Sequence, residues 1–131
     1  MHIRRTDKIV EAEYQTECAY ADQLAIMCGT RCDDLNVFIA TDDMDVVDGV
    51  RSCDSAQRHN WQLHNMDGDP GRGDGRANLY RLYAEMTLMV RAEWVVATFS
   101  SNVGRTVQLM RDQPPETMAS LDTDWSAGPW G

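Results

Sequence analysis

The sequence contains no apolar run that approaches the roughly 18 residues needed to cross a membrane as a helix. No apolar stretch follows the arginines near its start, so we expect neither a membrane span nor a signal peptide. Basic residues are also scarce: 12 Lys and Arg stand against 21 Asp and Glu, a formal net charge of -9. Without a broad basic surface, the chain is not expected to bind nucleic acid or an anionic membrane. Any phosphate site must therefore be local.

The cysteines fit neither paired zinc-ligand spacing nor the density of a disulfide-stapled scaffold. There are four of them, Cys18, Cys28, Cys32 and Cys53, and we expect free, partly buried thiols. At 131 residues and 43% hydrophobic, the chain is long enough for one core and too short for two ordinary domains. Residues 1–131 are therefore expected to form a single unit.

Hydrophobic periodicity predicts alternating helices and strands. The expected helices are Glu11–Met27, ended by Gly29, then Asn78–Val90 and Asn102–Asp112, with a shorter one at Met44–Cys53 interrupted by Gly49. The expected strands are Leu35–Asp43 and Trp94–Thr98, with a brief one around Trp61. One face of the helix at 78–90 should pack on the core through Leu79, Leu82, Tyr83, Met86, Met89 and Val90.

Glycine, proline and charge mark the remaining segments as irregular. The segment Asp67–Arg76 resembles a calcium loop but lacks the Glu at the twelfth position, so a solvated loop is favoured. After Pro114 and Pro115 the chain shows no period, and we expect an extended segment as far as Gly131.

Continuous apolar strands that end in polar turns predict an α/β fold, a Rossmann-like, doubly wound and mainly parallel sheet. Such sheets bind ligands at the carboxyl ends of their strands. Asp42 and Asp43 follow one strand, and Ser100, Ser101 and Asn102 join the other to a helix. Hydroxyls and N–H groups at a helix start could bind a phosphate. The alternative is that each turn only caps a helix, and the phosphate interpretation gains weight only if the turns converge.

The densest cationic cluster opens the chain, with Arg4, Arg5 and Lys8 in the stretch HIRRTDK. Paired surface arginines are usually only solvated. A guanidinium nevertheless presents five donors in a planar fork, which suits bidentate contact with a diphosphate.

Four blocks of the chain resemble the α-1,6-fucosyltransferase family, which core-fucosylates N-glycans and has bacterial relatives that act on chitooligosaccharides. HIRRTDK, VFIATDD, WVVATFSSNVGR and SLD occur in the family's order and approximate spacing, from Met1 to about Asp122. The resemblance implies the nucleotide-sugar-binding half of a two-domain, GT-B-like fold. It also implies that the strand leading into His2, the N-terminal acceptor half and a C-terminal SH3-like domain lie outside this sequence. The family has a disulfide where this chain has Ala97 and Gly104.

The resemblance assigns the donor, GDP-fucose, to several residues. Arg4 would bind the β-phosphate, His2 would lie beside the diphosphate, and Arg5 would support them. Ser101 would contact the diphosphate, and Glu85, where the family has Asp, would accept hydrogen bonds from guanine N1 and N2. The other donor-side positions are Asp42, Asp43, Ser100 and Asn102.

The resemblance also implies the reaction, an inverting and metal-independent transfer of fucose in α-1,6 linkage to the core N-acetylglucosamine of an N-glycan. Glu11 would be the general base, with Lys8 beside it, although a one-residue gap leaves Glu13 as a competitor. Arg4 would stabilise the leaving GDP. Asp42 and Asp43 resemble the metal-binding carboxylates of other glycosyltransferases, but they match the family's ATDD turn, where a structural or nucleotide-proximal role is favoured.

Two alternatives stay open: a non-catalytic module that binds GDP or a nucleotide sugar, and an inactive α/β fragment. A complete relative would work in the Golgi lumen, on a glycan acceptor.

Overall fold

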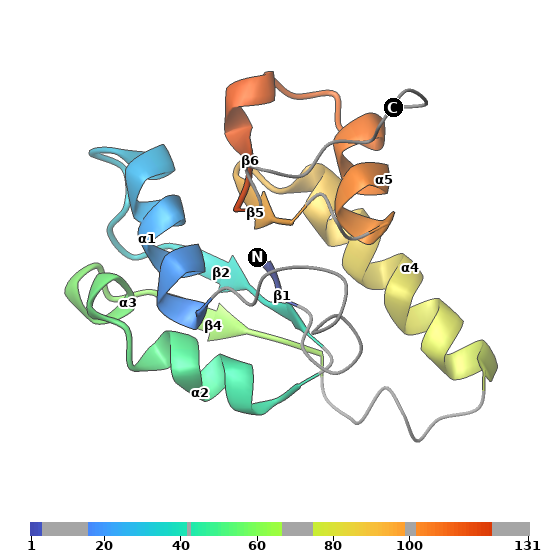
Figure 1. The fold of residues 1–131 in the computed structure, drawn as a ribbon, viewed down its shortest axis with the longest axis horizontal. Coiled ribbons are helices and arrows are strands. Elements are labelled where there is room, and N and C mark those ends of the chain that lie inside the picture. Colours follow the sequence, from blue (N-terminus) through green and yellow to red (C-terminus); the bar gives the residue numbers. More distant parts are fainter. Residues whose placement is uncertain (4–15, 42, 67–74, 99–101, 122–131) are drawn as a thin grey trace.

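The computed structural model describes residues 1–3, 16–41, 43–66, 75–98 and 102–121, and these form a mixed α/β structure (Figure 1). The expected alternation of helices and strands is thereby confirmed. In chain order the elements are β1 (His2–Ile3), α1 (Glu17–Cys28), β2 (Asn36–Phe38), β3 (Ala40–Thr41), α2 (Asp45–Arg51), α3 (Asp54–Arg58), β4 (Gln62–His64), α4 (Gly75–Arg91), β5 (Val95–Ala97), α5 (Asn102–Met110), a 3-10 turn η1 (Pro115–Thr117) and β6 (Met118–Ser120). No helix in the described part of the chain is long and apolar enough to span a membrane.

The described strands pair in parallel: β1 with β3, β2 with β4, and β5 with β6. Only Ile39 separates β2 from β3. Its N–H donates to His64 O on one side (2.7 Å), and the next N–H, that of Ala40, donates to Met1 O on the other (2.9 Å). Residues 36–41 therefore run between β4 and β1, and the single strand predicted at 35–43 changes partner at its middle.

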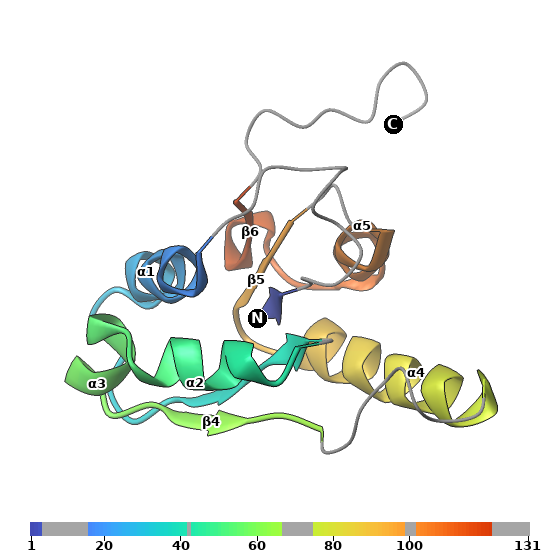
Figure 2. The ribbon, with the colours of Figure 1, turned by 60° about the horizontal axis from the view of Figure 1, so that its bottom comes forward.

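The core has two parts, and they follow the alternation of side chains along the strands. Ile39 and Val96 belong to one apolar cluster, whereas their neighbours Ala40, Val95 and Ala97 belong to the other. Successive strand residues point to opposite faces of a sheet. The first cluster includes residues of α1, α2 and α3, and the second includes residues of α4 and α5. Each face of the strands is therefore covered by its own group of helices, and the two groups are seen apart in Figures 1 and 2.

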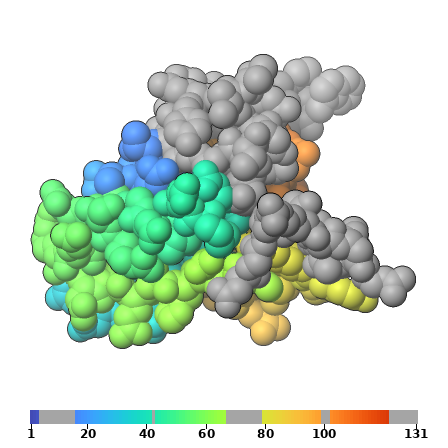
Figure 3. Space-filling model, turned by 90° about the horizontal axis from the view of Figure 1, so that it is seen from below, coloured from blue at the N-terminus to red at the C-terminus, as the bar shows by residue number. Residues whose placement is uncertain are grey.

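Two helix predictions were wrong in part. Gly49 does not interrupt α2, which runs through it. A Cβ at Gly49 would lie 2.9 Å from Glu17 Cγ, so glycine there allows α1 to approach closely. In α4, Met89 is buried, but Leu79 and Tyr83 are 63% and 73% exposed. The helix extends beyond the strands that it covers, so periodicity alone overestimated its buried face. Figure 3 shows α4 in yellow beside the green surface formed from α2 to β4.

Two predictions about the ends of the chain are refined. His2 and Ile3 themselves form strand β1, whereas the strand was expected before His2. The segment after Pro114 was expected to be extended; it first forms the η1 turn and then an extended strand, β6, which pairs with β5.

The expectation of free thiols was wrong. Cys18 is joined to Cys53, with Cα atoms 5.5 Å apart, and Cys28 to Cys32, with Cα atoms 5.1 Å apart. The first bridge joins α1 to the residue before α3, two segments that pack together. The second bridge closes the turn after α1. Pairing across packed helices depends on tertiary contacts that cysteine spacing does not encode.

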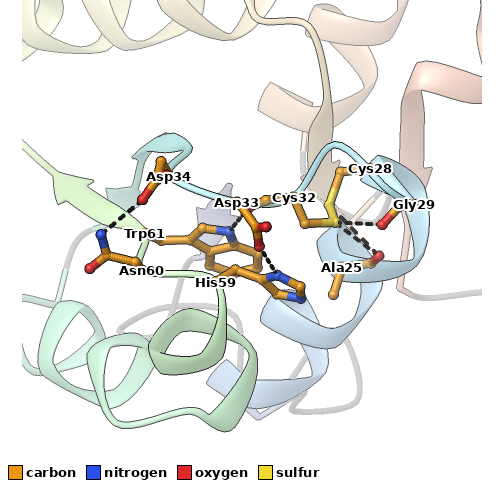
Figure 4. Close-up of polar contacts among 9 residues, drawn as sticks. All are labelled: Ala25, Cys28, Gly29, Cys32, Asp33, Asp34, His59, Asn60 and Trp61. Carbon is orange, nitrogen blue, oxygen red and sulfur yellow. Dashed lines mark hydrogen bonds and ion pairs between the residues drawn. A yellow bond between two sulfur atoms is a disulfide. The ribbon is translucent and has the colours of Figure 1, made fainter.

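A polar cluster holds the loops that lead into β2 and β4 (Figure 4). Trp61 is buried, and its indole N–H donates to Cys32 O (2.7 Å). His59 stacks on Trp61 and lies 2.8 Å from an Asp33 carboxylate oxygen, while Asn60 Nδ2 donates to Asp34 (2.9 Å). These contacts fix where the two parallel strands begin.

Candidate functional site at the carboxyl ends of the strands

The strands that carry the predicted motifs end at one edge of the structure. Ile3 is the last residue of β1 and pairs in register with Thr41, the last residue of β3. β5 lies beside β1, with Cα atoms within 8 Å, and Ala97 is its last residue. Because β1 and β3 are parallel, both end at the same side, and β5 lies next to β1. This edge is where an α/β sheet ordinarily binds its ligand.

Asp43 forms the turn that leads from β3 into α2. Thr41 Oγ1 accepts a hydrogen bond from Asp43 N–H (3.1 Å), and Asp43 Oδ1 accepts one from Asp45 N–H (3.0 Å). These bonds satisfy backbone donors at the start of the helix. The structure thus gives Asp43 a local structural role, one of the two that the sequence left open.

His2 and Glu85 lie on the same face of the strands. His2 is 6% exposed and pairs in register with Ala40, whose side chain belongs to the cluster under α4 and α5. Glu85 is 8% exposed and lies one helical turn before Met89, which is in the same cluster. Residues four apart share a helix face, so Glu85 is also on the side of α4 that faces the strands.

Arg81 is a partner of Glu85 that the sequence interpretation missed. Its Nε donates to Glu85 Oε1 (3.1 Å), and the side chains are only 13% and 11% exposed. A second guanidinium nitrogen of Arg81 donates to Met66 O (3.1 Å), just after β4. An Arg four residues before a buried Glu on one helix was the available signal. The pair holds a carboxylate in a largely buried position near the end of β4.

α5 begins with Asn102, whose side-chain oxygen accepts a hydrogen bond from Arg105. In the first turn of the helix, Gly104 is buried against the end of β5. A Cβ there would lie 2.4 Å from Thr98 O, closer than such atoms approach. Glycine therefore lets the first turn of α5 lie directly on the chain that leaves β5.

Among the described residues, two groups whose pKa is lowered by burial lie away from this edge. Burial lowers the pKa of the Met1 amino group from 8.0 to about 5, at the amino end of β1. Burial also lowers the pKa of Arg111, whose guanidinium donates to Met89 O and Ala92 O (both 2.8 Å) at the end of α4. Arg111 was not singled out from the sequence. Its hydrogen bonds join the residue that follows α5 to the end of α4.

The other predicted site residues lie outside the described residues. These are Arg4, Arg5, Lys8, Glu11, its competitor Glu13, Asp42, Ser100 and Ser101. Across the ranges that are described, no group of three or more His, Cys, Asp or Glu residues could hold a metal ion.

No protein-family model matches the chain, and no curated protein matches it either.

Proposed function

We propose that this chain is the GDP-fucose-binding part of an α-1,6-fucosyltransferase-like enzyme, which transfers fucose to the core N-acetylglucosamine of an N-glycan or to a chitooligosaccharide. The observation that carries the proposal is the parallel register of Ile3 with Thr41, with β5 beside β1. The HIRRTDK, ATDD and TFSS motifs each follow one of these strands. In the proposal, the three turns meet at one edge and share a ligand.

The proposed fold is a Rossmann-like, doubly wound sheet. Strand pairing and the proximity of β1 to β5 support the order β4, β2 with β3, β1, β5, β6. The order runs outward in both directions from β1, and the helices divide into two groups, as double winding requires. In such a fold the nucleotide lies across the carboxyl ends of the central strands.

An independent distance supports the alignment with the family. The family carries a disulfide at the positions of Ala97 and Gly104, one at the end of β5 and the other in the first turn of α5. A Cβ built at Gly104 would lie 3.6 Å from the Cβ of Ala97, a separation that disulfides commonly bridge. The two positions are therefore adjacent, as the alignment demands.

In the proposed mechanism, cations and helix-start donors hold the leaving group. Arg4 binds the β-phosphate in bidentate fashion, supported by Arg5 and His2, and stabilises the charge that develops on GDP. Ser100, Ser101 and Asn102 offer hydroxyl, amide and backbone donors at the positive end of α5. Asp42 and Asp43 shape the neighbouring turn. In this arrangement the negative charge that develops on GDP is stabilised without a metal.

Glu85 is the residue proposed to recognise guanine by hydrogen bonding. A carboxylate presents two acceptor oxygens side by side, which suits the paired N1 and N2 donors of the base. The Arg81 contact also fixes the longer Glu side chain, which takes the place of the family's Asp. Glu11, with Lys8 beside it, is the proposed base that removes the proton from the acceptor hydroxyl.

The two disulfides support a location in an oxidising compartment. The Golgi lumen, where the family acts, is such a compartment. This part of the proposal rests on the chemistry of the cysteines and on the family.

Isothermal titration of the purified chain with GDP, GDP-fucose and ADP tests the proposal. We expect GDP and GDP-fucose to bind and ADP to bind more weakly. Arg4→Ala should weaken GDP binding at least ~30-fold, since a bidentate charged contact contributes roughly 2–3 kcal/mol. Arg58→Ala is the matched control, because Arg58 is exposed on α3 and belongs to no motif. Equal affinity for GDP and ADP, or an Arg4 variant that binds as tightly as the control, would contradict the proposal.

A further inference from the structure

One apolar stripe of α4 is covered along only half of its length. Leu79, Tyr83, Met86 and Val90 follow the spacing i, i+4, i+7 and i+11, so they lie along one side of the helix. Met86 and Val90 pack against the apolar cluster that includes a residue of α5. Leu79 and Tyr83, in contrast, are 63% and 73% exposed. The amino-terminal half of α4 extends beyond α5, as Figures 1 and 2 show.

Two more apolar side chains widen the exposed half of the stripe. Tyr80 is 68% exposed and Leu82 is 38% exposed, and they flank Leu79 and Tyr83 on the helix. These four residues together form the α4 face. With roughly 200 Å² for a full side chain of this size, the α4 face exposes about 500 Å². A contiguous apolar patch of this area is near the upper end of what monomers expose, and such patches are often functional.

The α4 face is uncharged, although the chain is strongly acidic. From Asn78 to Val90 the sequence contains two charged residues, Arg81 and Glu85, and these are largely buried and paired with each other (3.1 Å). Arg76 and Arg91 lie near the two ends of the helix. A net charge of -9 makes two copies repel each other where acidic surfaces meet. The α4 face can meet its own copy without opposing like charges.

We propose that the α4 face is a dimer interface, on which two copies of this chain pack their α4 helices antiparallel about a twofold axis. A twofold interface uses the same patch on both copies, which an uncharged apolar face permits. In the antiparallel pair, Tyr83 of one copy lies opposite Leu79 of the other. The two α5 helices then lie at opposite ends of the contact, whereas parallel packing would bring them to the same end.

The area of the α4 face sets the expected strength of the dimer. Two faces bury about 1,000 Å², which is the low end for specific interfaces, so we expect a dissociation constant of about 1–100 µM. The inference is independent of the proposed transferase function, since the α4 face includes no donor-site residue.

Sedimentation equilibrium of the whole chain, over about 1–500 µM, tests the proposal. The four cysteines are bridged within the chain, so intermolecular disulfides do not complicate the assay. Tyr83→Lys and Leu79→Asp each place a charge on the α4 face. Ile26→Lys is the matched control, because Ile26 is also 73% exposed but lies on α1. Urea unfolding at the lowest concentration compares the stability of the monomers.

We expect the unmodified chain and the Ile26 variant to dimerise, and to do so more tightly at higher salt, because salt screens the repulsion between two acidic copies. Tyr83→Lys and Leu79→Asp should each raise the dissociation constant more than tenfold. Mixing these two variants should restore the dimer, since the new lysine on one copy lies opposite the new aspartate on the other.

A chain that stays monomeric at every concentration would overturn the proposal, as would equal weakening by Tyr83→Lys and Ile26→Lys. A mixture of the Tyr83 and Leu79 variants that associates no better than either alone would also contradict it. If the monomer lost stability in those two variants and not in the Ile26 variant, the α4 face would be covered by another segment of the same chain instead of by a second copy.

Discussion

Gly104 lies so close to Thr98 that a Cβ at position 104 would be 2.4 Å from the Thr98 carbonyl oxygen. This contact presses the first turn of α5 onto the end of β5. The same close approach brings the amino end of the helix to the edge where the motif strands end. The packing of a single glycine thus links the stability of the fold to the geometry of the proposed diphosphate site.

Gly104→Ala should therefore destabilise the protein by about 1–3 kcal/mol, the usual cost of forcing extra volume into a packed site. It should also weaken GDP binding, because α5 must move away from the turn after β5. Urea unfolding and isothermal titration measure the two effects. Gln108→Ala, on the exposed side of the same helix, should change neither, and an unaltered Gly104→Ala protein would contradict the packing argument.

Glu85→Gln should reduce the preference for GDP over ADP by roughly tenfold or more, since an amide cannot accept from both guanine donors as a carboxylate does. Arg81→Ala should lower that preference as well, by releasing the carboxylate from its position. Titration with both nucleotides gives the ratio of affinities. Arg91→Ala, exposed at the far end of α4, is the control. Unchanged selectivity in both Glu85 and Arg81 variants would remove Glu85 from the guanine site.

Glu11→Gln should lower the rate of fucose transfer by roughly 10²–10⁴ while leaving GDP affinity intact, because a general base acts on the acceptor and not on the donor. The assay requires the chain joined to an acceptor-binding half of the family type. Glu13→Gln should stay active. The opposite result, an inactive Glu13 variant and an active Glu11 variant, would transfer the role of base to Glu13.

The two disulfides should contribute unequally to stability. The bridge from Cys18 to Cys53 closes a loop of 35 residues, and that from Cys28 to Cys32 one of 4. Loop-closure entropy gives about 4 kcal/mol for the first and about 2 kcal/mol for the second. Paired substitution of each bridge by alanine, followed by urea unfolding, measures both. Losses of equal size would show that unfolded-state entropy is not the main contribution.

Stability should rise as the pH increases from about 5 to 8, because the Met1 amine is neutral in the folded chain over this range and protonated in the unfolded one. Three pKa units correspond to at most about 4 kcal/mol. Acetylation of the Met1 nitrogen removes this titration and leaves the three histidines in place. The difference between unmodified and acetylated chains should therefore grow toward pH 5, and parallel pH profiles would show that the amine is not buried in solution.

Local sequence determined most of the elements. Apolar runs placed β5 and the strand at residues 36–41, and Gly29 ended α1 as expected, with φ 57. Asn102 was correctly predicted to begin α5. These features depend on backbone preferences and side-chain periodicity within a few residues. The sequence also predicts polar residues directly after the strands, and the candidate site built from them stays a prediction.

Only the tertiary structure decided which cysteines pair, how far α4 extends beyond the core, and that Arg81 has contacts with both Glu85 and Met66. That β1 and β3 end side by side was likewise decided by their register. Each of these depends on contacts between residues distant in the chain, and periodicity contains no information about such partners. Burial and strand register are set when whole elements pack. The sequence therefore predicted the individual helices and strands, and packing determined which of their residues are in contact.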